Sequence, residues 1–269
     1  MELVAILSGV LDYKRPLEAP RSGNWIDILD TPTVPYRLSP FDEAALETAL
    51  KLRESGSASH LTVVVTHGSG DTNLLRQIAA YKPDRIRALN PSLPMRMNAR
   101  ELCKAIAAQL QDIRNITDLW LVGREHGDLD DGAVPPFLAK CLDLVFINEG
   151  LTVQQLENGA IEVESIRSGA LRTTQISKKA IMISVTNDKR NRLRHPLMKN
   201  VALAKQLRFE VEELSLSSTD KTTETNVLEM LPSPARLNRD TPCQTIDGDD
   251  HKKAKELLDW LMHEMAGKR

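Results

Sequence analysis

The sequence predicts an α/β protein built on a doubly wound, mostly parallel sheet. Short apolar runs alternate along the chain with longer segments of helical period, and the connections between them are brief. The apolar runs are rich in β-branched residues and almost uninterrupted, which is typical of strands that helices cover on both faces. After residue 143 the runs become shorter and partly alternate with polar residues, which adds a small antiparallel insert to the sheet.

The individual elements follow from these patterns. Strands of the parallel sheet are expected at residues 3–10, 61–65, 84–89, 119–122, 180–185 and 209–214. Apolar spacing predicts helices at residues 71–80, 98–111, 137–142, 201–207 and 251–265, after a first helix that begins near residue 40. That first helix has the clearest limits, since Ser39 suits the N-cap, Pro40 suits the first helical position and Gly56 follows the end.

The antiparallel insert is predicted from four short segments at residues 145–147, 151–156, 161–166 and 171–176. Asn158 and Gly159 are a typical turn pair between two of them. Two other stretches lack period. Residues 12–40 contain five prolines, which exclude a long helix, and residues 231–250 contain three and are expected to form an extended arm after a polar linker at 215–225.

Composition excludes several classes of protein. The 35 basic and 37 acidic residues leave a net charge of -2, so no overall field favours nucleic acid or a membrane surface. Three distant cysteines, Cys103, Cys141 and Cys243, show neither metal spacing nor a disulfide framework, which fits a reducing compartment. No run approaches the ~18 apolar residues of a membrane span, and the N-terminus is too short and too acidic for a secretion signal. A cytoplasmic location is expected.

The segment 123–136, GREHGDLDDGAVPP, is the strongest candidate for a binding loop. It lies between a predicted buried strand and a helix, where open α/β sheets bind nucleotides. Its glycines permit positive φ or a close ligand. Asp128, Asp130 and Asp131 either accept hydrogen bonds from a ribose or cap the next helix, whose start offers N–H groups to a phosphate. A well-capped surface loop explains the spacing equally well.

Catalytic motifs are missing from the sequence. It contains no Gly-x-Ser-x-Gly, no Cys/His pairing, no P-loop and no GxGxxG after the first strand. His126, near Asp128 and Asp130, imitates a metal site but has no second nitrogen or sulfur ligand beside it, so no metal is expected. The residues thus predict a nucleotide-binding α/β domain without its own catalytic groups.

Three motifs, in order, resemble one family. The segment 39–50, SPFDEAALETAL, resembles the Asn-Pro-Phe-Asp-Glu helix of the electron transfer flavoprotein beta subunit. The loop 123–136 is similar to that family's acidic nucleotide loop, and 194–205, RHPLMKNVALAK, is similar to its Arg-Tyr-Pro-x-Leu-Pro-Asn-Ile-Met-x-Ala-Lys segment. The likeness covers residues 1–214 and implies a Rossmann-like fold of the adenine nucleotide alpha-hydrolase type.

The resemblance implies an electron carrier rather than an enzyme. The chain would pair with an alpha subunit that holds most of the FAD, accept electrons from a flavin dehydrogenase and pass them to a quinone oxidoreductase. Residues 1–214 would form the nucleotide-binding domain, and the arm and helix of 215–269 would wrap the alpha subunit. The resemblance also implies a structural AMP, with contacts from Ser8, Gly9, Val10, Ser39, Pro40, Phe41, Asp42, Thr66, Gly123, Asp128, Leu129, Asp130, Asp131, Gly132, Ala133 and Val134.

By the same resemblance, the basic loop at 187–200 would recognise the dehydrogenase. Met198 falls where the family has the leucine that docks in a partner pocket, and a flexible methionine can fill an irregular pocket. The docking set comprises Arg190, Arg192, Arg194, Pro196, Leu197, Met198 and Asn200. The three arginines would steer an acidic partner surface. Arg194 alternatively would reach toward the alpha-subunit flavin, and a solvated loop without a partner is the other alternative.

Several residues depart from the family pattern. Residues 8–12, SGVLD, replace its Lys-Gln-Val-Pro-Asp segment, Ser39 stands for asparagine, Ala133 for glutamine and Pro135 for glycine, which puts AMP itself in doubt. Leu129 stands where electron-bifurcating relatives have glycine, and its bulk argues against a second flavin. Two rivals remain: a stand-alone nucleotide-binding regulator, and an adenine-nucleotide hydrolase, which would need a phosphate-binding loop after the first strand.

Overall fold

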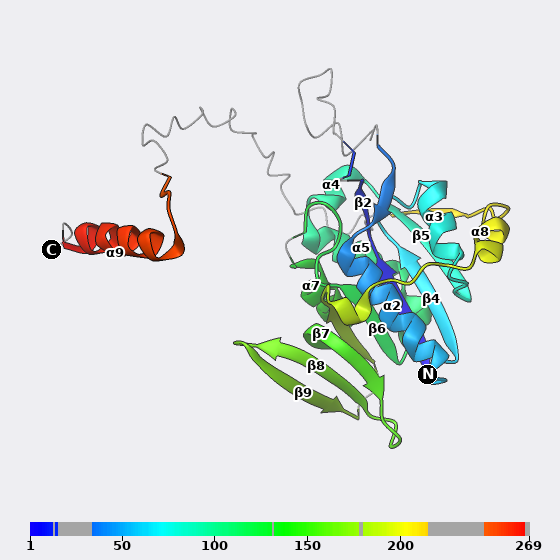
Figure 1. Cartoon of the computed structure of the whole chain (residues 1–269). Coiled ribbons are helices and arrows are strands. Elements are labelled where there is room, and N and C mark those ends of the chain that lie inside the picture. The colour runs from blue at the N-terminus through cyan, green and yellow to red at the C-terminus, as the bar shows by residue number, and fades with distance from the viewer. Residues whose placement is uncertain (13, 16–33, 131, 178–179, 215–244, 267–269) are drawn as a thin grey trace. The chain divides into compact units, whose positions relative to one another are not determined.

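The computed structural model confirms the predicted fold class. It describes residues 1–12, 14–15, 34–130, 132–177, 180–214 and 245–266, which fall into two units, Met1–Asp220 and Lys221–Arg269. The first unit contains a nine-stranded sheet with helices on both faces, and Figure 1 shows this layered arrangement. Asp131, the linker at 215–225 and most of the predicted arm lie outside the described residues.

The strand order of the large sheet is β11-β5-β4-β1-β6-β10-β7-β8-β9. Pairing is parallel from β11 to β7 and antiparallel from β7 to β9. The strands are β1 Glu2–Leu7, β4 His60–Val65, β5 Arg85–Pro91, β6 Leu119–Gly123, β7 Val145–Gln155, β8 Ile161–Arg167, β9 Ala170–Ile176, β10 Ile181–Val185 and β11 Val211–Leu214. A separate ribbon pairs β2 Gly9–Leu11 with β3 Tyr36–Leu38 in antiparallel fashion.

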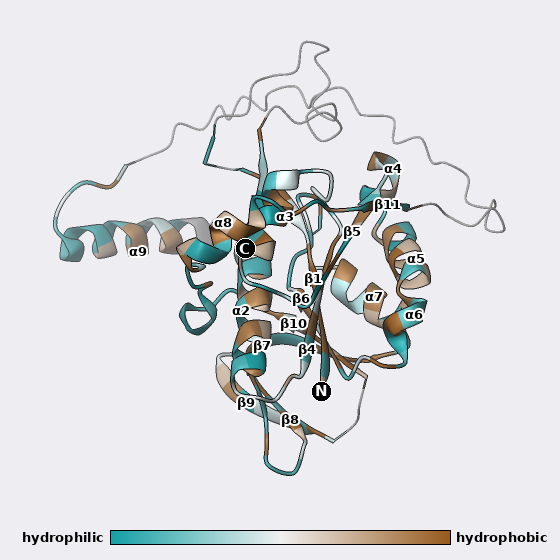
Figure 2. Cartoon of the chain, turned by 90° about the vertical axis from the view of Figure 1, so that its right-hand side faces the viewer, coloured by the Kyte–Doolittle hydropathy of each residue, from teal (hydrophilic) through white to brown (hydrophobic). Residues whose placement is uncertain are grey.

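Helices cover both faces of the sheet, as Figure 2 shows with α2, α3 and α8 on one side and α5, α6 and α7 on the other. They are α2 Pro40–Glu54, α3 Thr72–Ala79, α4 Leu93–Arg96, α5 Ala99–Gln109, α6 Gln111–Arg114, α7 Val134–Cys141 and α8 Met198–Ala204, with a 3-10 turn η1 Lys189–Asn191. An apolar core lies on each face of the sheet, and alternate residues of β1 point into one core or the other. Leu3 and Leu7 pack in the core that includes α2 and α3, whereas Val4 and Ile6 pack in the core with α5 and α7.

Several of the expected elements need correction. Helix α7 begins at Val134, three residues before its predicted start, and the helix predicted at 98–111 is two, α5 and α6. The first predicted strand breaks at Ser8, because its end turns away from the sheet as β2 and pairs with β3. The runs at 145–147 and 151–156 are one strand, β7, whose first half extends the parallel sheet and whose second half starts the antiparallel part. Helix α8 begins at Met198, three residues earlier than the apolar spacing predicts.

The second unit contains the helix α9 Asp250–Ala266. The Asp249 carboxylate accepts a hydrogen bond from the Lys252 backbone N–H at 2.8 Å, which caps the N-terminus of this helix. Leu257, Leu258 and Trp260 of this helix are exposed within the chain. Among the helices that the structure describes, neither α9 nor any other combines the length and the apolar composition needed to cross a membrane.

Candidate functional site

The predicted binding residues gather at the carboxyl end of the central strand. β1 lies between β4 and β6, and the chain continues to β4 and β5 on one side and to β6 and β10 on the other. This reversal of strand order is the topological switch point, where parallel α/β sheets place their ligand crevice. Ser8 follows β1, Thr66 follows β4, and the loop from Gly123 follows β6, so the sheet brings all three predicted segments together.

The start of α2 is tied to the end of β1 by Asp42. Its carboxylate accepts a hydrogen bond from the Ser8 backbone N–H at 3.0 Å and another from the Ser39 hydroxyl. The Ser39 hydroxyl in turn accepts from the Asp42 N–H at 3.0 Å, which confirms Ser39 as the N-cap of α2. Complete burial raises the pKa of Asp42 to about 7, because desolvation outweighs the hydrogen bonds that favour the charged form.

The carboxylates of the acidic loop bind backbone groups of the chain itself. Asp128 accepts from the Leu11 N–H at 3.1 Å, which holds the loop against β2, and burial raises its pKa. Asp130 accepts from the N–H groups of His126, Ala133 and Val134 at 3.0, 2.7 and 3.1 Å, so it caps the start of α7. Asp130 thus takes the capping role that the sequence allows, Asp128 binds the ribbon instead, and Asp131 lies outside the described residues.

The other predicted cofactor residues divide into packed and exposed ones. Gly123 lies so close to α2 that a Cβ there would be 3.0 Å from the Phe41 Cβ, which explains a glycine by packing alone. Gly9 donates to the His67 carbonyl at 2.8 Å, and Val10 is buried in the ribbon. Leu129 by contrast is 49% exposed. Pro40 begins α2, and Gly132 has a φ of 102° just before α7.

Two buried histidines, which the sequence analysis did not assign to the site, fill the space between these segments. His126 is 1% exposed and its Nε2 lies 2.7 Å from the Thr66 hydroxyl. His67 is 4% exposed, and the two imidazole rings meet edge to face with centroids 5.5 Å apart. Burial lowers the pKa of His126 to about 4 and that of His67 well below its ordinary value, so both rings are neutral at pH 7.

A signal for these histidines was present in the sequence. Each follows one of the two strands that flank β1, His67 directly after Thr66 and His126 in the loop after β6. Residues just past the carboxyl ends of neighbouring parallel strands share one crevice. The pattern cannot tell whether such a side chain points inward, because no apolar period extends into a loop.

The basic loop is fixed to α2 by Arg194. Its guanidinium forms paired hydrogen bonds with the Glu47 carboxylate, at 2.7 Å from Nη2 to Oε1 and 3.0 Å from Nε to Oε2, and also binds Glu54. The Arg194 carbonyl accepts from the Tyr81 hydroxyl at 2.9 Å. The Glu47 side chain is only 5% exposed, so this is an ion pair with one buried partner. Arg194 is thus already bound within the chain.

Beyond Arg194 the loop presents apolar and basic side chains to solvent. Met198 is 80% exposed and Leu197 is 60% exposed. Arg190 binds Asp188 at 2.8 Å and Glu164 at 3.3 Å, whereas Arg192 and Lys199 form no ion pair with the residues that the structure describes. Pro196 and Asn200 are partly buried. The structure therefore separates the predicted docking set into Arg190 and Arg194, which hold the loop, and an exposed group around Met198.

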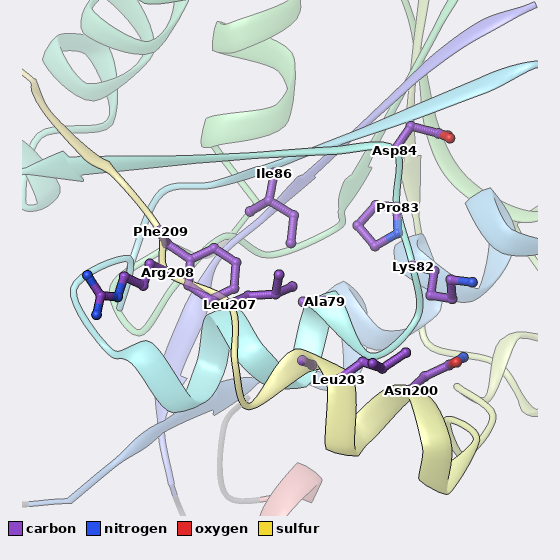
Figure 3. Close-up of a pocket in the computed structure, with 11 residues that line it drawn as sticks. Ala79, Lys82, Pro83, Asp84, Ile86, Asn200, Leu203, Leu207, Arg208 and Phe209 are labelled. Atoms are coloured by element: carbon purple, nitrogen blue, oxygen red, sulfur yellow. The ribbon is translucent and has the colours of Figure 1, made fainter.

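A pocket of about 380 Å³ lies elsewhere, between α3, α8 and the start of β5. Figure 3 shows Ile86 of β5 and Leu203 of α8 on opposite sides of it, with Phe209 also in its lining. The start of β5 belongs to the amino end of the parallel sheet, so this pocket lies at the opposite end from the switch point. It is therefore separate from the crevice at the switch point.

The sequence matches the family described as the electron transfer flavoprotein domain over residues 28–217, which is most of the chain. The chain belongs to the electron transfer flavoprotein family. A curated relative from Syntrophomonas wolfei, named electron transfer flavoprotein subunit beta, is 27% identical over 169 residues, which cover 63% of this chain and 64% of the relative. The mitochondrial beta subunit of Oryza sativa subsp. japonica is 27% identical over 65% of this chain and 72% of its own length. The beta subunit of Bradyrhizobium diazoefficiens is 24% identical over 85% and 88%.

These relatives confirm the resemblance to beta subunits of this flavin-associated family of electron carriers. The resemblance implies a bound AMP. The hydrogen-bonding groups at the switch-point crevice of this electron transfer flavoprotein domain do not fit that ligand. Asp42, Asp128 and Asp130 already accept from backbone N–H groups, and Asp130 occupies the amides at the start of α7. Two buried atoms at the crevice, Ser8 Oγ and His126 Nδ1, have no hydrogen-bond partner. The described residues also contain no group of three or more metal-ligating side chains.

Proposed function

We propose that this chain is the beta subunit of a heterodimeric electron transfer flavoprotein. It would take electrons from a flavin dehydrogenase through an FAD held mainly by an alpha subunit, and deliver them to a quinone oxidoreductase. Its own part would be to bring the flavin to the donor, without an acid or base of its own. AMP is left out of this proposal, because the groups that would bind it are paired within the chain.

The observation that carries the proposal is the basic loop ahead of α8. Arg194 and Glu47 hold its base on α2, while Met198 stands 80% exposed beyond that attachment. An apolar side chain on a firmly held backbone loses less entropy on docking than one on a mobile loop. Arg192 and Lys199 add positive charge beside it, which favours approach to an acidic surface. These features support a role in recognising the donor dehydrogenase.

We further propose that residues 1–214 and 215–269 have separate tasks. The first segment would carry the α/β fold, and the second would wrap the alpha subunit. The exposed apolar residues of α9, Leu257, Leu258 and Trp260, support this division, because large apolar side chains gathered on one helix mark an interaction surface. Most of the stability of a helix in a protein comes from packing of its apolar face, so contact with a partner would stabilise this 17-residue helix.

The test is to coexpress the chain with an alpha-type subunit and measure flavin reduction by candidate flavin dehydrogenases. Met198→Asp should slow reduction at least about tenfold, because a charge would have to be desolvated in an apolar pocket, while heterodimer yield and FAD content stay unchanged. Leu171→Asp is the matched control, since Leu171 is 59% exposed on β9, away from the loop.

Equal reduction rates for Met198→Asp and the wild type would contradict the docking role. A chain that purifies alone, with no flavoprotein partner, would instead favour a stand-alone nucleotide-binding regulator.

A further inference from the structure

The crevice at the switch point is covered by the chain itself. The loop after β6 crosses the carboxyl end of β1, and Asp128 fastens it to the Leu11 N–H on the far side. Gly127, with a φ of 82°, lies directly over the site, since a Cβ there would be 3.0 Å from Ser8 Oγ and 3.1 Å from His67 Nε2. The loop backbone therefore lies in van der Waals contact with the floor of the crevice.

The space below this loop is filled by the two imidazole rings. His126 comes from the covering loop and reaches Thr66 at the end of β4, across the end of β1. His67 packs edge to face against it. Both rings are almost fully buried, as are Ser8 and Thr66. Each imidazole ring is flat and carries hydrogen-bonding nitrogens at its edge, as a nucleobase does.

The groups that a phosphate would need are also in use. The α7 amides that would face it bind Asp130, Asp42 and Asp128 each accept from a backbone amide, and Asp131 lies outside the described residues. On the described segments that follow β1, β4 and β6, the buried atoms without a partner are Ser8 Oγ, Ser69 Oγ and His126 Nδ1, fewer than a base, a ribose and a phosphate require.

We propose that the His126 side chain, supported by His67, occupies the position at which beta subunits of this family would hold AMP, so that this chain folds without a bound nucleotide. His126 comes from the loop that would otherwise close over the ligand, and it ties that loop to β4 through Thr66. It thus performs the structural task of the nucleotide with a side chain. This inference concerns the crevice alone and is independent of the proposed docking surface.

The first experiment measures the nucleotide content of the purified full-length chain, alone and with its flavoprotein partner, by acid release and chromatography. We expect adenine nucleotide far below one per chain after FAD has been subtracted. One AMP per chain would overturn the proposal. This experiment measures bound nucleotide and not electron transfer. Its result therefore does not depend on whether the proposed electron-transfer function is correct.

The second experiment uses His126→Ala, which removes the ring and leaves room under the loop. AMP should raise the thermal midpoint of this variant and bind it at least about tenfold more tightly than it binds the wild type. His60→Ala is the matched control, since His60 lies at the start of β4, at the other end of the sheet, with a side chain 42% exposed. A folded His126→Ala chain that shows no gain in AMP affinity would contradict the role of this residue.

If His126→Ala does not fold, the imidazole signals of the wild-type chain provide the test. The imidazole ¹⁵N signals of His126 and His67 should stay unshifted when AMP is added to the full chain at millimolar concentration, because the rings already occupy the site. A saturable shift of both signals would show that AMP enters the crevice and would overturn the proposal.

Discussion

At the scale of single residues, Asp42 joins the end of β1 to the start of α2 through one buried carboxyl group. It binds the Ser8 amide at the end of β1, and it binds the hydroxyl of Ser39 at the cap of α2. With a pKa of about 7, the group binds a proton in the folded chain at mildly acidic pH, where an unfolded chain with a value near 3.8 would release it. Folding is therefore linked to proton uptake at this residue.

Asp42→Asn should make the chain more stable than the wild type at pH 7. The gain in stability should be smaller at pH 4. Between about pH 4 and 7 the folded wild type retains the Asp42 proton, so its stability falls as the pH rises, and asparagine removes this loss. The difference in free energy of unfolding should grow with a limiting slope of about 1.4 kcal/mol per pH unit. Urea denaturation across this range measures it.

The control is Asp143→Asn, because the Asp143 side chain is 86% exposed. Its difference from the wild type should stay nearly constant over the same range. The histidines act in the opposite sense, since lowered pKa values cost stability as pH falls below about 6.5, and this contribution is common to both chains and cancels in the comparison.

The sequence predicted which segments meet at the strand ends but not the contacts that they form there. Ser39, Asp130 and Thr66 were placed correctly near the strand ends, because a cap motif and buried strands are local patterns. Whether Asp130 would meet a ribose or its own backbone depended on how the loop folds back, which spacing does not encode. The inward orientation of His126 depended on the approach of β4 from a distant part of the chain.

At the scale of elements, local sequence patterns again fail where contacts with distant parts of the chain decide the structure. This explains the corrected boundaries of the strands and helices. The residues between Ile147 and Leu151 look like a break in the sequence, yet β7 continues through them with Glu149 at a φ of 58° and a shift of register in its pairing with β10. Such irregularities keep a strand continuous while the local pattern is lost. The buried strands β1, β4 and β10 were predictable because their residues are mostly apolar and buried on both faces.

Arg194→Ala should destabilise the chain by about 2–4 kcal/mol, because Glu47 would remain buried without its partner. The loss should be partly recovered by adding Glu47→Gln, which removes the buried charge. Thermal and chemical denaturation measure both effects.

Arg190→Ala is the control for the Arg194–Glu47 ion pair, since Arg190 lies on the same loop. The Arg190 side chain is 44% exposed and its partners are reached by solvent, so its removal should cost no more than about 1 kcal/mol. Equal losses at the two arginines would contradict the view that Arg194 is the attachment of the loop.

At the scale of the whole molecule, the two apolar cores belong to the first unit alone. Their members run from Leu3 to Leu214, with β1 contributing to both. The second unit, Lys221–Arg269, contributes no residue to these clusters within the described part of the chain. The α/β fold is therefore stabilised within the first unit, apart from the segment proposed to wrap the alpha subunit.

A chain ending at Asp220 should accordingly fold with a cooperative thermal transition close to that of the full chain, and should lose most of its affinity for the alpha subunit. Calorimetry and a co-purification assay measure the two properties. A truncated chain that fails to fold would show that the second unit supports the first, contrary to the division of tasks proposed for residues 1–214 and 215–269.

The central place of β1 has a consequence for the timing of folding during synthesis. Leu3 pairs with Leu119 on β6, so one side of the first strand stays without its neighbour until more than a hundred further residues have been made. At translation rates of roughly 5–20 residues per second, that interval lasts on the order of 6–20 seconds. During this time the nascent chain displays an open strand edge and an apolar face. The yield of folded protein should therefore depend on the chaperones that meet the chain at the ribosome.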